Sequence, residues 1–189
     1  MKKTIILIAL LLLISLSFFF VFKTNNARNE RRANFTQIPV FALPNIHGDT
    51  ITEQSLRKNV PTLFVFFEPG GCGPCDVVMR GINARKADFS AFQLVFFSPL
   101  PSAYIREYLD EIEFEPAENM FFLADERAEL FNLMNIRSSP TVFIYNSEGV
   151  LTREFRGFVN TEMLLKSTHP NLPEGEAFEK CEKARMNGI

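Results

Sequence analysis

The sequence has few of the residues that build metal sites and disulfide-rich scaffolds, with three cysteines and two histidines among 189 residues. Cys72, Cys75 and Cys181 are too few for a small domain held together by disulfides. A tetrahedral zinc site needs four ligands, and only His47 and His169 could add to these cysteines. Cys72 and Cys75 are separated by two residues, and no second Cys-x-x-Cys pair exists to complete a zinc site. We therefore expect no bound metal and no cofactor other than a redox-active disulfide between Cys72 and Cys75.

Neither sign of charge is in large excess. Lysine and arginine total 20 against 22 for aspartate and glutamate, which gives a formal net charge of −2. Nucleic-acid binding normally needs a basic surface, so this composition argues against a nucleic-acid partner. Tryptophan is absent, whereas 21 phenylalanines indicate an apolar core and an apolar segment rather than a particular function.

Charged residues are also missing from residues 4–22, an apolar run that only Thr4, Ser15 and Ser17 interrupt. A run of about 20 apolar residues is long enough to cross a bilayer as a helix. It is longer than the apolar region of a typical cleaved signal, and no small-x-small cleavage site follows it. We therefore expect a transmembrane signal anchor at residues 1–22, with export after signal cleavage as the alternative.

Basic residues flank this apolar run on both sides, so the positive-inside rule is close to a tie. The short basic segment before the run resembles an export signal, and we expect the folded domain on the periplasmic or extracytoplasmic side. Residues 23–36 are polar without periodicity and are expected to form a tether. The folded domain is expected at residues 37–168, followed by a poorly packed C-terminal tail at residues 169–189.

The motif that carries chemistry is Cys72-Gly73-Pro74-Cys75, placed after an apolar run of strand length and before a helical pattern. Two intervening residues let both sulfurs meet across one helical turn. Cys72 then lies at a helix N-terminus, where free backbone N–H groups and the helix dipole stabilise a thiolate. Because a thiolate is the species that attacks disulfides, the motif predicts a dithiol with Cys72 attacking and Cys75 resolving. A static disulfide is the alternative.

Short apolar runs alternate with helical patterns along the rest of the domain. Strands are expected at residues 62–67, 92–97, 120–123, 141–145 and 150–155. Helices are expected at residues 76–87, 101–112, 126–134 and 161–167, with Ser102 as a cap of the second. Two short strands flank a turn at residues 45–49. This order predicts an α/β three-layer sandwich with a central mixed sheet and an N-terminal hairpin extension.

These features together resemble the thioredoxin superfamily over about residues 37–167. The resemblance is carried by Phe41-Ala42-Leu43-Pro44, by the Cys-Gly-Pro-Cys motif, by Ser139-Pro140-Thr141 before a strand and by the Glu148-Gly149 turn. With the apolar N-terminal run, the chain resembles TlpA-like membrane-tethered thiol–disulfide oxidoreductases. The resemblance implies a reductase of disulfides in exported proteins that receives electrons from a membrane thiol donor.

The resemblance also implies a substrate site. Pro140 matches a cis proline that faces the two cysteines, and Ser139 before it offers backbone groups to an extended substrate segment. Gly71 stands beside the first cysteine, where the family usually has tryptophan. We expect Gly71, Ser139 and Pro140 to contact the substrate, and a proline that merely precedes a strand is the alternative for Pro140.

Two acidic positions of the family are lost in this chain. Phe66 stands where thioredoxins have a buried aspartate, and Val78 where many TlpA-like proteins have glutamate. An acid at either position helps to remove the proton from the second cysteine. Glu68 and Asp76 are the nearby substitutes as a proton relay, and the alternative for each is a solvent-facing carboxylate.

Other functions stay open at this point. A copper-binding assembly factor of the same fold would use both cysteines and a histidine, but His169 is poorly placed and such proteins usually separate their cysteines by three residues. A non-catalytic binding module would keep the dithiol as a vestige. A thiol peroxidase ranks lower, because the Pro-x-x-x-Thr-x-x-Cys pattern is absent before Cys72. Cys181 is expected to be a free thiol, with a dimer link or a second redox partner as alternatives.

Overall fold

The computed structural model of the chain describes residues 36–168. The predicted anchor at residues 1–22, nearly all of the predicted tether and the predicted tail with Cys181 lie outside the described residues. Within residues 36–168, no helix is long and apolar enough to cross a membrane.

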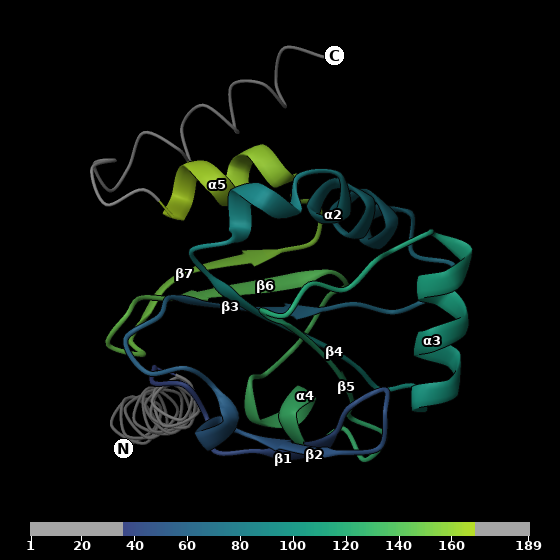
Figure 1. Cartoon of the computed structure of the whole chain (residues 1–189), viewed down its shortest axis with the longest axis horizontal. Helices are drawn as coiled ribbons and strands as arrows, with labels where there is room; N and C mark the ends of the chain where they lie inside the picture. Colours follow the sequence, from purple (N-terminus) through teal and green to yellow (C-terminus); the bar gives the residue numbers. More distant parts are fainter. Residues whose placement is uncertain (1–35, 169–189) are drawn as a thin grey trace, which may run out of the picture.

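A five-stranded mixed sheet forms the centre of the domain (Figure 1). β3 (Thr62–Phe66) is the middle strand, and β4 (Gln93–Ser98) and β5 (Met120–Ala124) extend the sheet in parallel on one side. β6 (Thr141–Tyr145) and β7 (Leu151–Arg156) extend it in antiparallel fashion on the other. Every residue of β3, β4 and β6 is buried, which explains why these strands are continuous apolar runs in the sequence.

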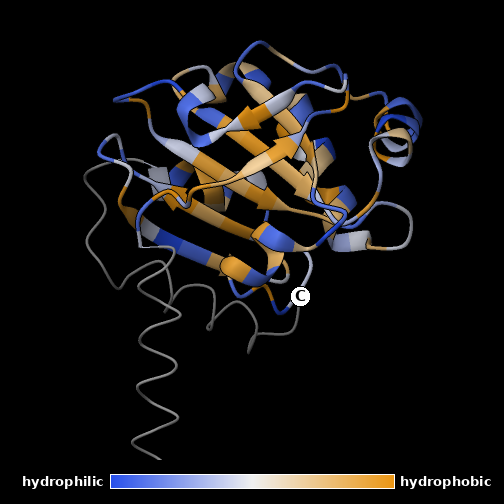
Figure 2. Cartoon of the chain, turned by 90° about the horizontal axis from the view of Figure 1, so that it is seen from below, coloured by the Kyte–Doolittle hydropathy of each residue, from blue (hydrophilic) through white to orange (hydrophobic). Residues whose placement is uncertain are grey.

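Helices and a hairpin cover the two faces of this sheet. The apolar core on one face includes side chains of α2 (Gly73–Ala84), α3 (Ser102–Glu111) and α5 (Thr161–Thr168). The core on the other face includes side chains of α4 (Glu129–Leu133) and of β1 (Ala42–Pro44), which pairs with β2 (Thr50–Thr52). Two 3-10 helices, η1 (Glu53–Ser55) and η2 (Lys86–Phe89), complete the described elements. Figure 2 shows the apolar residues concentrated on the strands between these layers. The predicted three-layer α/β sandwich with an N-terminal hairpin is confirmed.

Three helices begin at residues other than those that the sequence predicts, and α2 and α3 are the first two. α2 begins at Gly73 rather than residue 76, because Cys72 is its N-cap and Pro74 fits the first helical turn. The prediction of Ser102 as a cap is wrong, since Pro101 precedes the first turn of α3. The Ser102 hydroxyl instead donates to the carbonyl of Asn45 at 3.2 Å and ties α3 to the turn of the hairpin.

A buried aspartate after β5 sets the start of α4. The carboxylate of Asp125 accepts hydrogen bonds from the backbone N–H groups of Glu129, Leu130 and Phe131 at 2.8, 3.3 and 2.7 Å. Ala128 between them has a φ of 55°, in the left-handed region, so the chain turns sharply before the helix. The free N–H groups of the first turn are therefore satisfied by a side chain from the end of a strand, and α4 is shorter than the predicted residues 126–134.

We expect Asp125→Ala to lower the free energy of unfolding by about 2–4 kcal/mol, because three N–H groups lose their acceptor. Chemical denaturation of the full chain measures this loss. Asp88→Ala is the matched control, since Asp88 is an exposed carboxylate paired with Arg85, and it should cost less than about 0.5 kcal/mol. Similar losses in the two variants would contradict the role given to Asp125.

Candidate active site

The two cysteines of the motif lie where the chain passes from β3 to α2. Between them and the strand, Gly70 and Gly71 have φ angles of 77° and 139°, which glycine adopts readily and other residues do not. These two residues let the chain leave the middle of the sheet and turn into the N-terminus of α2. The cysteines are thereby positioned at the end of the central strand.

Cys72 and Cys75 form a disulfide across the first turn of α2, with their Cα atoms 5.1 Å apart. The two sulfur-bearing residues differ in exposure, because Cys72 is partly exposed whereas Cys75 is fully buried. The backbone N–H of Cys75 donates to the Cys72 Sγ at 3.3 Å. This donor and the helix N-terminus both stabilise negative charge on Cys72. An incoming thiol or disulfide can therefore reach Cys72, and that sulfur is the one favoured as a thiolate.

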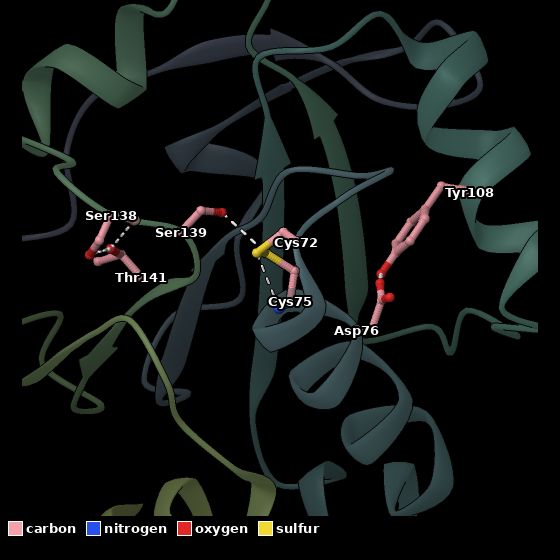
Figure 3. The surroundings of a disulfide bond; sticks show 7 residues. All are labelled: Cys72, Cys75, Asp76, Tyr108, Ser138, Ser139 and Thr141. Carbon is pink, nitrogen blue, oxygen red and sulfur yellow. Dashed lines mark hydrogen bonds between the residues drawn. A yellow bond between two sulfur atoms is a disulfide. The ribbon is translucent and has the colours of Figure 1, made fainter.

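The turn before β6 faces the disulfide from the side opposite Asp76 (Figure 3). The peptide bond between Ser139 and Pro140 is cis. The Ser139 Oγ lies 3.1 Å from the Cys75 Sγ, across a separation of 64 residues in the sequence. The Pro140 carbonyl accepts a hydrogen bond from the N–H of Gly157 at 2.8 Å, which fixes the turn to the end of β7. The structure thus brings Ser139, which precedes the cis bond to Pro140, into contact with the Cys72–Cys75 disulfide at Cys75.

The carboxylate of Asp76 is bonded to another helix rather than to the cysteines. Its Oδ1 accepts a hydrogen bond from the Tyr108 hydroxyl at 2.7 Å, on the side of α2 that faces α3 (Figure 3). Burial, together with this bond to Asp76, raises the pKa of Tyr108, so the phenol keeps its proton and donates. The contact ties the first turn of α2 to α3.

The predicted proton relay through Glu68 or Asp76 stays a prediction. Glu68 is exposed on the loop before the cysteines. Within residues 36–168, neither carboxylate makes a hydrogen bond to the sulfur of Cys72 or Cys75. In the same part of the chain, no group of three or more histidine, cysteine, aspartate or glutamate residues is arranged to hold a metal ion.

Two exposed apolar residues on segments that lead to this site were not expected from the sequence. Phe158, which follows Gly157, is 63% exposed, and Val77, two residues after Cys75 on α2, is 45% exposed. A contiguous exposed apolar patch often marks a binding surface, whereas single exposed apolar side chains are common. The sequence signal for Phe158 was an aromatic residue directly after Gly157, the glycine that follows β7. The alternation of apolar and polar residues along a strand does not reveal where a side chain beyond the end of that strand points.

Comparison with known proteins places the chain in a family. The AhpC/TSA family matches residues 36–154, a range that contains both cysteines and the Ser139–Pro140 turn. The chain belongs to the AhpC/TSA family. No curated protein matches it.

Several solved structures resemble this AhpC/TSA protein. A secreted disulfide oxidoreductase of Mycobacterium tuberculosis, homologous to E. coli DsbE, is 16% identical with a TM-score of 0.58, over 67% of this chain and 92% of that one. StoA from Bacillus subtilis is 18% identical with a TM-score of 0.57, over 71% and 99%. The peroxidoxin BcpB of Mycobacterium tuberculosis is 12% identical with a TM-score of 0.60, over 69% and 92%. At these identities the likeness establishes the thioredoxin-like fold.

We expect Tyr108→Phe to lower the free energy of unfolding by about 1–2 kcal/mol, because the Asp76 carboxylate loses its donor. The rate at which dithiothreitol reduces the Cys72–Cys75 disulfide should change little. Denaturation and reduction kinetics of the same preparation measure both quantities. Tyr104→Phe, which alters an exposed tyrosine of the same helix, is the control. A large fall in the reduction rate at unchanged stability would contradict a purely structural contact and favour a relay through Asp76.

Proposed function

We propose that this protein is a thiol–disulfide oxidoreductase that reduces protein disulfides through Cys72 and Cys75. The observation that carries the proposal is the unequal disulfide at the start of α2, with Cys72 partly exposed and Cys75 fully buried. An accessible sulfur stabilised as a thiolate suits the attack on a substrate, and a second sulfur bonded to it suits the release of that substrate.

The proposed cycle needs only these two thiols and the substrate disulfide. The Cys72 thiolate attacks one substrate sulfur, a mixed disulfide forms, and the other substrate sulfur leaves as a thiolate. The Cys75 thiolate then attacks Cys72, the Cys72–Cys75 bond closes, and the remaining substrate sulfur leaves as a second thiolate. Two electrons pass to the substrate, and an external thiol donor restores the dithiol.

The surroundings of the disulfide support a protein substrate. The backbone N–H and C=O groups of Ser139 make no hydrogen bond within residues 36–168, so both can pair with an extended segment. Gly71 leaves the approach to Cys72 open, where a larger side chain would stand. Phe158 and Val77 add apolar surface on the segments that flank the disulfide.

The TlpA-like subtype is part of the same proposal. The apolar run at residues 4–22 supports a tethered domain on the periplasmic or extracytoplasmic side, with a membrane thiol as electron donor. The secreted Mycobacterium tuberculosis oxidoreductase among the similar structures is in keeping with that location. Export after signal cleavage is the alternative.

We expect the Cys75→Ser variant, mixed with a disulfide-containing protein such as insulin, to accumulate a covalent mixed disulfide through Cys72, because the resolving thiol is missing. Cys72→Ser should form none and should reduce insulin only at the uncatalysed background rate. Non-reducing electrophoresis and mass spectrometry of the full chain measure both results. Cys181→Ser is the matched control and should behave as the wild type does. If Cys72→Ser retained the wild-type rate, Cys72 would not be the attacking thiol and the proposed cycle would be wrong. If the wild type were inactive, the protein would be a binding module of this fold.

A further inference from the structure

The dithiol cycle requires negative charge on a buried sulfur. When a thiol reduces the Cys72–Cys75 disulfide by attacking Cys72, the electron pair of the broken bond stays on Cys75. Cys75 is fully buried and packs in the apolar cluster that contains Val78 and Met79. Apolar burial raises the pKa of a thiol and disfavours its thiolate. The leaving sulfur therefore needs a hydrogen-bond donor of its own.

Most groups near Cys75 cannot supply this donor. Val78 and Met79, which share its apolar cluster, have no polar side-chain group that could donate. The carboxylate of Asp76 accepts from Tyr108. The backbone N–H of Cys75 itself already donates to the Cys72 sulfur at 3.3 Å and to the Cys72 carbonyl oxygen at 2.8 Å. Within residues 36–168, the hydrogen bond to the Cys75 Sγ comes from the Ser139 hydroxyl at 3.1 Å.

The direction of this bond follows from the chemistry of the disulfide. A disulfide sulfur carries no hydrogen, so the Ser139 hydroxyl is the donor and the Cys75 Sγ is the acceptor. The hydroxyl is thus already directed at the atom that becomes negatively charged when the bond breaks. A hydrogen bond from a neutral donor to an ionised acceptor is about twice as strong as one between neutral groups.

We propose that the Ser139 side chain is a catalytic residue of the dithiol cycle, whose hydroxyl stabilises the Cys75 thiolate. This role rests on the proposed function, because it concerns the same two cysteines. A donor thiolate attacks the Cys72 Sγ, a bond forms between the donor sulfur and Cys72, and the Cys72–Cys75 bond breaks. Cys75 keeps the electron pair while Ser139 donates to it, and water later supplies the proton. In the reverse direction the same contact supports Cys75 as it attacks Cys72.

Ser139→Thr and Ser139→Val test this role as a pair, since the two side chains have nearly the same shape and only threonine has a hydroxyl. We expect Ser139→Val to slow the reduction of the disulfide by dithiothreitol about tenfold relative to Ser139→Thr. The pKa of the reduced Cys75, followed by the NMR shift of its Cβ in the full chain, should be about one unit higher in the valine variant. A merely structural role for the hydroxyl would leave that pKa difference near zero.

Ser138→Ala is the matched control, because the Ser138 hydroxyl lies near the Thr141 hydroxyl and away from the sulfurs (Figure 3). It should match the wild type in rate and in the pKa of Cys75. Ser139→Ala, compared with the wild type, repeats the test without added volume if valine prevents folding.

Equal rates and equal Cys75 pKa values in the threonine and valine variants would overturn the role of Ser139, while their intact redox cycle would leave the proposed function standing. Absence of a reducible Cys72–Cys75 disulfide in the wild type would overturn both.

Discussion

A disulfide across the first turn of a helix makes its two sulfurs unequal, and the rest of this site depends on that inequality. The N-cap sulfur of Cys72 lies at the helix N-terminus near the surface, whereas the Cys75 side chain points into the core beneath α2. The fold maintains this arrangement because α2 packs on the central strand of the sheet, and Gly70 and Gly71 allow the sharp exit from that strand. The two sulfurs are thus distinguished by burial, by the backbone N–H that faces Cys72 and by the hydroxyl that faces Cys75.

The second half of the site follows from strand pairing. β6 lies antiparallel beside β3, so that Thr141 at the start of β6 pairs with Phe66 at the end of β3. The turn that precedes β6 must therefore lie beside the loop that follows β3. This pairing brings Ser139 to the Cys75 sulfur across 64 residues of sequence, and the bond from Gly157 to Pro140 connects the turn to the next strand.

The sequence was informative where a single physical property decides the structure. Strands buried on both faces, such as β3 and β6, are continuous apolar runs, and the spacing of the two cysteines indicates one helical turn. It was misleading where a distant residue decides. Ser102 has the chemistry of a cap but bonds to the hairpin, and α4 is shortened because Asp125 reaches its N–H groups from the end of β5.

The contacts around the disulfide were beyond a reading of the sequence for the same reason. Asp76 was placed near the cysteines by sequence distance alone, yet its carboxylate bonds to Tyr108 on α3. Ser139 was assigned to the substrate through its backbone, and only the pairing of β3 with β6 shows that its hydroxyl meets the buried sulfur. Sheet order, rather than proximity along the chain, brings the Ser139 hydroxyl to the Cys75 sulfur.

A redox titration of the Cys72–Cys75 pair in the full chain, with Cys181→Ser to isolate it, tests the central claim most directly. We expect a reversible two-electron couple in the reducing range, near the value of about −270 mV that thioredoxin shows. A couple near about −120 mV would instead mark an oxidant of dithiols and contradict the proposed direction. If no reversible couple between Cys72 and Cys75 is observed, the oxidoreductase assignment itself is wrong.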